Sequence, residues 1–94
     1  MKTLRIEHRV SSFDGWRNAF DSDPINRKQS GVIKYRIYRP AENVNFVMIE
    51  LDFENLEQAQ SAKAALEKIF PNIDGKLIFD VQLTLLELVD ETIL

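Results

Sequence analysis

The sequence contains no cysteine and only one histidine among its 94 residues. Without a thiol, the chain cannot form a disulfide, a cysteine nucleophile, an iron–sulfur cluster or the usual structural zinc site. Because His8 stands alone, one chain cannot build a multi-histidine metal site, and a serine–histidine–aspartate relay could be built only around that residue. We therefore expect neither a metal site nor a cofactor.

Long apolar runs are also missing, since no segment approaches the roughly 18 apolar residues of a membrane span. The first ten residues, MKTLRIEHRV, lack the apolar region and cleavage site of a secretory signal, so a cytoplasmic location is expected. A net charge of −3 argues against nucleic acid or an anionic membrane as partner. The length fits one domain, residues 1–94, with a small molecule or a protein as its partner.

Apolar and polar residues alternate in several segments, which is typical of strands that have one buried face. The pattern predicts strands over residues 3–10, 32–39 and 44–53. A fourth strand is expected over residues 83–90, although Leu85 and Leu86 are both apolar and leave its phase ambiguous. Residues 72–81 receive no assignment.

Two other segments show helical spacing. Phe13, Trp16 and Phe20 recur on one face after a weak capping signal at Ser11, and Pro24 ends this helix. A second helix is predicted after Asn55 and before Pro71. The order β-α-β-β-α-β predicts an α+β, ferredoxin-like domain with a four-stranded antiparallel sheet in the order 4-1-3-2.

Two helices cover only one face of such a sheet. The all-apolar side of the strands is expected there: Leu4, Ile6, Val10, Ile33, Ile37, Val47, Ile49, Leu51 and Phe53. The second face alternates basic and acidic residues, which favours a ladder of cross-strand ion pairs over an anion pocket around Arg36.

The second face is also partly apolar. Phe46 and Met48 share it, and Leu83 and Leu85 are expected on or beside it. A contiguous apolar patch is more often covered than left in water, so we expect a homodimer in which two sheets pack face to face. Arg36, Tyr38, Phe46 and Met48 are the candidate ligand contacts on this face.

The remaining candidates each have two interpretations. His8 lies in the phase of the first strand that faces the helices, so a proton-transfer role is possible, although a buried structural histidine is the commoner case. Trp16 is typical of core packing and could equally line a ligand pocket. The run Asp21–Ser22–Asp23 resembles a metal pair, but Arg27 and Lys28 nearby favour a local ion pair.

The segments RIEHRVSSFDGWRNAFDSDPINRKQSGVIKYRIYRP, NFVMIELDF and NLEQAQSAKAAL together resemble the dimeric α/β-barrel superfamily, in its cyclase-like or stress-responsive branch. The resemblance covers residues 4–70. It implies a protomer whose sheet pairs with that of a partner, with a cavity between sheet and helices. Haem-degrading members carry a histidine on the second helix. Residues 55–70 contain none, which argues against a haem-based function.

Two functions follow from the resemblance. The first is a homodimeric binding or regulatory protein without turnover, which holds a small molecule in its cavity or is simply a structural partner. The second is a cofactor-independent monooxygenase, cyclase or isomerase that acts on an aromatic or polyketide-like substrate. The superfamily includes both enzymes and members of no known activity, so the fold alone does not choose between them.

Overall fold

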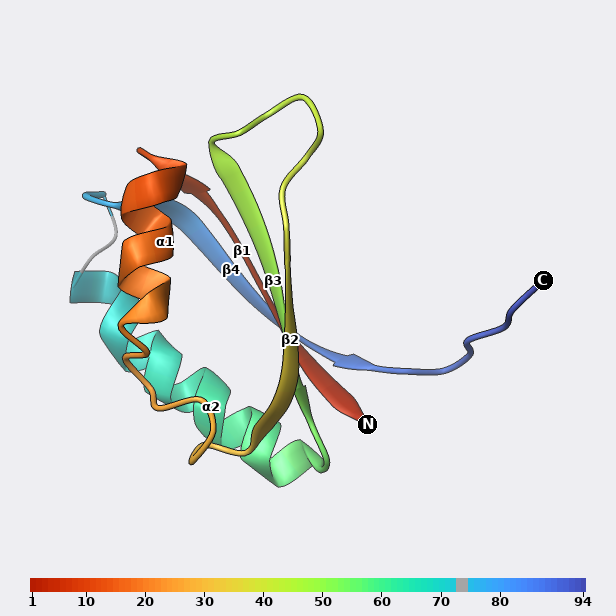
Figure 1. The fold of residues 1–94 in the computed structure, drawn as a ribbon. Helices are drawn as coiled ribbons and strands as arrows, with labels where there is room; N and C mark the ends of the chain where they lie inside the picture. Colours follow the sequence, from red (N-terminus) through yellow and green to blue (C-terminus); the bar gives the residue numbers. More distant parts are fainter. Residues whose placement is uncertain (73–74) are drawn as a thin grey trace.

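A computed structural model describes residues 1–72 and 75–94, and within them the predicted β-α-β-β-α-β order is confirmed. Two helices pack on one side of a twisted sheet, and the C-terminal segment extends away from the body (Figure 1). The elements are β1 (Lys2–Val10), α1 (Phe13–Asp21), β2 (Val32–Tyr38), β3 (Phe46–Phe53), α2 (Leu56–Ile69), a short 3-10 turn (Phe70–Asn72) and β4 (Ile78–Glu87).

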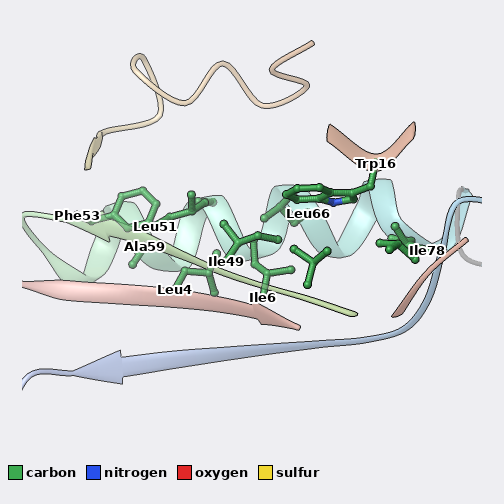
Figure 2. Packing of buried hydrophobic residues seen from close by; sticks show 12 residues of the cluster. Leu4, Ile6, Trp16, Ile49, Leu51, Phe53, Ala59, Leu66 and Ile78 are labelled. Atoms are coloured by element: carbon green, nitrogen blue, oxygen red, sulfur yellow. The ribbon is translucent and has the colours of Figure 1, made fainter. Parts of the chain in front are cut away.

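The sheet is antiparallel and its strand order is β2-β3-β1-β4, as predicted. β1 and β3 occupy the centre, so their alternating residues are covered on one face by the helices. Leu4 lies opposite Leu51 and Ile6 lies opposite Ile49 in the register of this central pair. Figure 2 shows these side chains gathered between the strands and α2.

Both helices begin at a side chain that caps the first turn. Asn55 precedes α2, and its Oδ1 accepts a hydrogen bond from the Gln58 amide at 2.9 Å, as the sequence pattern indicates. The cap of α1 is Ser12, whose Oγ accepts from the Gly15 amide at 3.2 Å, so the expected capping residue Ser11 was wrong by one position.

The fourth strand differs from its predicted position. β4 begins at Ile78 and ends at Glu87, whereas the alternation had suggested residues 83–90. Leu83 pairs with Ile6 and Leu85 pairs with Leu4, so both leucines face the helices and not the second face. Because a strand's side chains alternate, Leu86 lies on the second face instead.

Ile33 is the second correction. The register of β2 against β3 shifts between Val32 and Lys34, and Ile33 falls within this irregularity. A bulge adds a residue that has no opposite partner, so alternation no longer predicts where its side chain points. Ile33 is 54% exposed and does not belong to the core.

No helix in the described part of the chain is long and apolar enough to cross a membrane.

Candidate functional site

A cavity of about 90 Å³ lies between the sheet and the helices. Its walls are largely apolar, with contributions from the sheet, α1 and α2: Ile6, Ile49, Leu51, Trp16, Phe20 and Leu66. Two ionisable side chains, those of His8 and Arg27, also line it. An apolar hollow with a few polar groups at its wall is the usual form of a small-molecule site.

His8 lies near the end of β1 on the face that the helices cover, as its alternation phase predicted. It is only 1% exposed, and its ring lies 6.1 Å from Trp16 and 6.4 Å from Phe70 between ring centres. Its Nδ1 lies 3.1 Å from the Arg9 carbonyl oxygen. Since a carbonyl can only accept, Nδ1 carries the proton, and in a neutral ring Nε2 is then the hydrogen-bond acceptor.

Burial lowers the pKa of His8 below its ordinary value of 6.5, and the hydrogen bond to the Arg9 carbonyl opposes this shift. The imidazole is therefore neutral at pH 7. The cavity thus holds a neutral imidazole beside apolar walls, which can accept a hydrogen bond at Nε2, while the same burial makes the ring a weaker base than a free imidazole.

This pKa shift makes the stability depend on pH. As the pH falls below 6.5, the unfolded chain takes up a proton that folded His8 does not bind, so the free energy of unfolding should decrease. The slope approaches about 1.4 kcal/mol per pH unit between the two pKa values. Because His8 is the only histidine, the His8→Gln variant should lose this slope.

Denaturant titrations at a fixed protein concentration, between about pH 7 and pH 5, would measure both slopes. Parallel slopes in the wild type and the variant would show that His8 does not titrate as a buried group.

Arg27 forms the charged part of the cavity wall. It lies in the loop between α1 and β2, and its Nη1 donates a hydrogen bond to the Phe20 carbonyl at 2.7 Å. The guanidinium lies 3.9 Å from the centre of the Phe20 ring and 5.3 Å from that of Tyr35. Asp23 holds the start of this loop, because its Oδ1 accepts from the Arg27 amide at 2.8 Å. The sequence did not single out Arg27 as a cavity residue.

The second face of the sheet carries the expected ion-pair ladder. Arg36 donates from Nη1 and Nη2 to the two carboxylate oxygens of Asp52 at 2.7 and 2.8 Å, and from Nε to Glu50 at 3.0 Å. Arg5 reaches Glu50 at 3.3 Å and Glu7 at 2.9 Å. The ladder of cross-strand pairs is therefore confirmed on this face.

Asp52 is the buried centre of this ladder, with only 1% of its surface exposed. The hydrogen bonds from Arg36 hold the pKa of Asp52 below its ordinary value, although burial acts in the opposite direction. The Thr3 hydroxyl donates a further hydrogen bond at 2.8 Å. Asp52 in turn is the main cause of a raised pKa at Arg36, so both groups are charged across the ordinary pH range.

The candidate site residues fall into two groups on opposite faces of the sheet. His8 and Trp16 line the cavity under the helices. Arg36, Tyr38 and Met48 lie on the second face, where Arg36 pairs with Glu50 and Tyr38 pairs with Met48 in the β2–β3 register. Phe46 lies on that same face, opposite Arg9. The sheet therefore separates these four residues from the cavity.

The two aspartates at the C-terminal end of α1 each make a local ion pair. Asp23 makes an ion pair with Arg27 at 3.5 Å, and Asp21 makes one with Arg17 at 3.3 Å. No group of three or more metal-ligating side chains gathers in the described residues. Local ion pairs, which the sequence favoured, are what this segment contains.

Phe70 and Ile78 are two further cavity residues that the sequence did not indicate. Phe70 follows α2 in the 3-10 turn, and Ile78 opens β4. Both lie in or beside the segment that had no predicted assignment. The alternation of β4 could have indicated Ile78 only if the start of that strand had been known.

Comparisons with known proteins bear on the fold. No family model matches the sequence, and no curated protein matches it. A proposed antibiotic biosynthesis monooxygenase from Deinococcus radiodurans is similar in structure, with a TM-score of 0.77 and 13% identity over 100% of this chain and 98% of that one. A variant of SnoaB, a cofactor-independent oxygenase from Streptomyces nogalater, is also similar in structure. Its TM-score is 0.76, with 11% identity over 96% of this chain and 94% of that one.

A dimeric ferredoxin-like protein from an uncultured marine organism aligns over 99% of both chains, with a TM-score of 0.69 and 13% identity. The chain has the ferredoxin-like fold of these solved structures. The expected fold class and the resemblance in fold are thereby confirmed. At these identities the ferredoxin-like fold is what the chains share, and a shared fold does not carry an activity with it.

Proposed function

We propose that this ferredoxin-like protein is a homodimer that binds one small, mostly apolar molecule in the cavity between its sheet and helices. The observation that carries the proposal is the His8 side chain, a neutral ring whose Nε2 is an acceptor, in the wall of a largely apolar hollow. The expected cytoplasmic location and single domain are parts of the same proposal.

The size of the cavity limits the ligand. At about 90 Å³ it is smaller than the roughly 300–1,000 Å³ of pockets for drug-sized ligands, and smaller than the engineered cavity of about 150 Å³ that accepts benzene. A ligand of about one small ring therefore fits with modest displacement of the walls. A polycyclic molecule would require α1 to move away from the sheet.

The chemistry of the wall limits the ligand further. Trp16, Phe20 and Phe70 provide ring surfaces. A ligand hydroxyl directed at His8 Nε2 would satisfy the ring nitrogen that the Arg9 carbonyl leaves free. We therefore expect a single-ring molecule with one hydrogen-bond donor, of which phenol is the simplest probe.

The homodimer is proposed from the second face. Phe46, Met48 and Leu86 lie there beside an ion-pair ladder that is already satisfied within one chain. A second copy of the same sheet would cover these apolar side chains without leaving a charge unpaired. We assign Arg36 and Tyr38 to this interface. Sedimentation that gives a monomer at micromolar concentration would overturn the assignment.

Binding of phenol and toluene tests the cavity. We expect the His8→Phe variant, which keeps a ring of similar volume, to bind phenol about tenfold more weakly and toluene unchanged, because one hydrogen bond is worth about 1.4 kcal/mol. Calorimetry or NMR titration would measure both ligands.

The Tyr38→Phe variant is the matched control, since it removes a hydroxyl from the other face of the sheet. Phenol binding that both variants weaken equally would contradict the proposed site. So would tighter binding of 1-naphthol than of phenol by the wild type.

The second candidate function is oxidation of such a phenol by O₂ without a cofactor. The neutral His8 imidazole favours it, because a hydrogen bond from the ligand hydroxyl to Nε2 would hold the ring in place and draw the hydroxyl proton partly away as O₂ attacks. Phenol and one O₂ would then give benzoquinone and water. Oxygen consumption in the presence of phenol would support this function. Binding without oxygen consumption would leave the first proposal standing alone.

A further inference from the structure

β4 contains a one-residue bulge directly opposite His8. In the antiparallel register of β1 and β4, Glu7 lies opposite Gln82 and Arg9 lies opposite Phe79. His8, the one residue between Glu7 and Arg9, therefore faces two residues of β4. Bulges of this kind often lie next to functional sites, where they change the direction of a side chain.

The extra residue is recognisable from its backbone. Asp80 has a φ of +58°, in the left-handed region where residues other than glycine are uncommon and aspartate is among those tolerated. Its Oδ2 accepts hydrogen bonds from Arg9 Nε at 3.0 Å and from Arg9 Nη2 at 2.8 Å. Since both side chains are exposed, this ion pair adds little stability, and the bulge depends chiefly on the backbone conformation of Asp80.

The bulge reverses which residues of β4 face the helices. After the bulge, Leu83 pairs with Ile6, so the odd-numbered residues of β4 face the helices. Before the bulge, Ile78 pairs with Val10 and is 1% exposed, while Phe79 points to the second face. Without the extra residue, unbroken alternation would place Phe79 opposite Val10 and turn Ile78 to the second face.

This reversal decides which side chain forms the cavity wall. Ile78 lines the cavity and belongs to the buried cluster of Figure 2. The ring of Phe79 instead lies 5.1 Å from the Arg9 guanidinium, between the ring centre and Cζ. A phenylalanine ring is larger than an isoleucine side chain, and the cavity measures only about 90 Å³. Phe79 in the place of Ile78 would therefore occupy space that a single-ring ligand needs.

Backbone hydrogen bonds hold the start of β4 in this arrangement. The Ser11 amide donates to the Leu77 carbonyl at 3.1 Å, and the Gly75 amide donates to the Ile78 carbonyl at 2.7 Å. The pairs that follow the bulge hold the rest of the strand in the opposite alternation. The mismatch between the two parts of β4 is therefore absorbed at Asp80.

We propose that the bulge at Asp80 determines which ligands the cavity accepts, because it keeps Phe79 out of the cavity and leaves the space beside His8 open to a single ring. This rests on the proposed function, since it concerns the same cavity. Asp80 is a positioning residue, which acts through the alternation of β4 and does not touch the ligand.

Deletion of Asp80 tests the proposal, because it removes the bulge and changes no other side chain. We expect the shortened chain to keep its fold by circular dichroism and to bind phenol at least about tenfold more weakly, since Phe79 then lies at the cavity wall. Adding Phe79→Ala to the deletion should restore phenol binding to within about threefold of the wild type.

Asp80→Gly is the matched control. Glycine adopts a positive φ readily, so this variant loses the ion pair with Arg9 but keeps the bulge. It should bind phenol within about twofold of the wild type. A loss as large as that of the deletion would assign the effect to the ion pair and overturn the role of the bulge.

NMR measures the same change without a ligand. His8 and Trp16 are the only histidine and the only tryptophan of the chain, so their ring signals are unambiguous. We expect nuclear Overhauser effects from the Phe79 ring to one of these rings in the deletion variant, and none in the wild type or in Asp80→Gly. A wild type that binds no phenol would overturn the proposed function, and these signals would still decide whether the bulge keeps Phe79 out.

Two variants with unchanged strand pairing decide the question if the shortened chain does not fold. Ile78→Phe places a ring at the same wall and should weaken phenol binding at least about tenfold. Phe79→Ala removes a ring from the second face and should change it by less than about twofold. Equal effects of these two variants would overturn the proposal, as would a folded deletion variant that binds phenol like the wild type.

Discussion

Replacing Arg36 with methionine is expected to lower the free energy of unfolding by about 3 kcal/mol, measured by denaturant titration at fixed protein concentration. Asp52 is 1% exposed, and it accepts two hydrogen bonds from Arg36. The Arg36→Met variant leaves a buried carboxylate with only Thr3 and the distant Lys34 amine, 3.9 Å away, as partners. An uncompensated buried charge costs far more than a lost surface pair.

Two further variants isolate the cause. Lys34→Met removes an exposed cation that lies near the same carboxylate. This variant should lower the free energy of unfolding by less than about 0.5 kcal/mol. The double variant Arg36→Met with Asp52→Leu should recover most of the lost stability, because it removes both members of the pair. A double variant no more stable than Arg36→Met would show that the loss comes from packing and not from charge.

The same experiment has a pH dependence. The pKa of Asp52 is lowered in the folded protein, so the contribution of the pair is fully present above the ordinary carboxyl pKa of 3.8. The contribution of the pair is lost as the pH falls through the lowered pKa of Asp52. The difference between the wild type and Arg36→Met should therefore shrink in acid.

Replacing Trp16 with alanine is expected to lower the free energy of unfolding by about 3–5 kcal/mol and to change which ligands bind. Trp16 is buried and packs against Phe13 and Phe20, with ring centres 5.6 and 5.2 Å apart, so its removal enlarges the cavity beside His8. The enlarged cavity should bind 1-naphthol more tightly than phenol, reversing the order expected for the wild type.

Because this loss is a large part of the 5–15 kcal/mol by which a domain is stable, Trp16→Leu serves as the milder variant. Its cavity should grow less, and its preference for 1-naphthol should be correspondingly smaller. An unchanged preference in both variants would place the ligand somewhere other than beside Trp16.

The sequence predicted the strands whose alternation is unbroken and failed where alternation was ambiguous or interrupted. The burial of His8 followed directly from its phase in β1, between the core residues Ile6 and Val10. In β4, Leu85 and Leu86 are both apolar, so the alternation does not indicate which of them faces the core. Only the pairing with β1 shows that Leu85 does. At Ile33 a register shift broke the pattern, which no local rule could indicate.

The cavity was harder to predict than the sheet. Trp16 was recognised because helical spacing placed it on the buried face of α1. Arg27 reaches the same cavity from a loop, through contacts with Phe20 and Tyr35 that depend on how α1, the loop and β2 meet in space. Such contacts have no periodic signal in the sequence.

The central place of β1 determines when the sheet can be completed during synthesis. β1 is made before the other strands of the sheet, yet one of its two neighbours is β4, the last of them in chain order. Because the ribosomal exit tunnel encloses the residues that have just been made, β4 can pair with β1 only after the whole of β4 has been made and has left the tunnel. The nascent chain therefore passes through a stage in which β1 is an open edge, where neighbouring nascent chains on one messenger could pair with it.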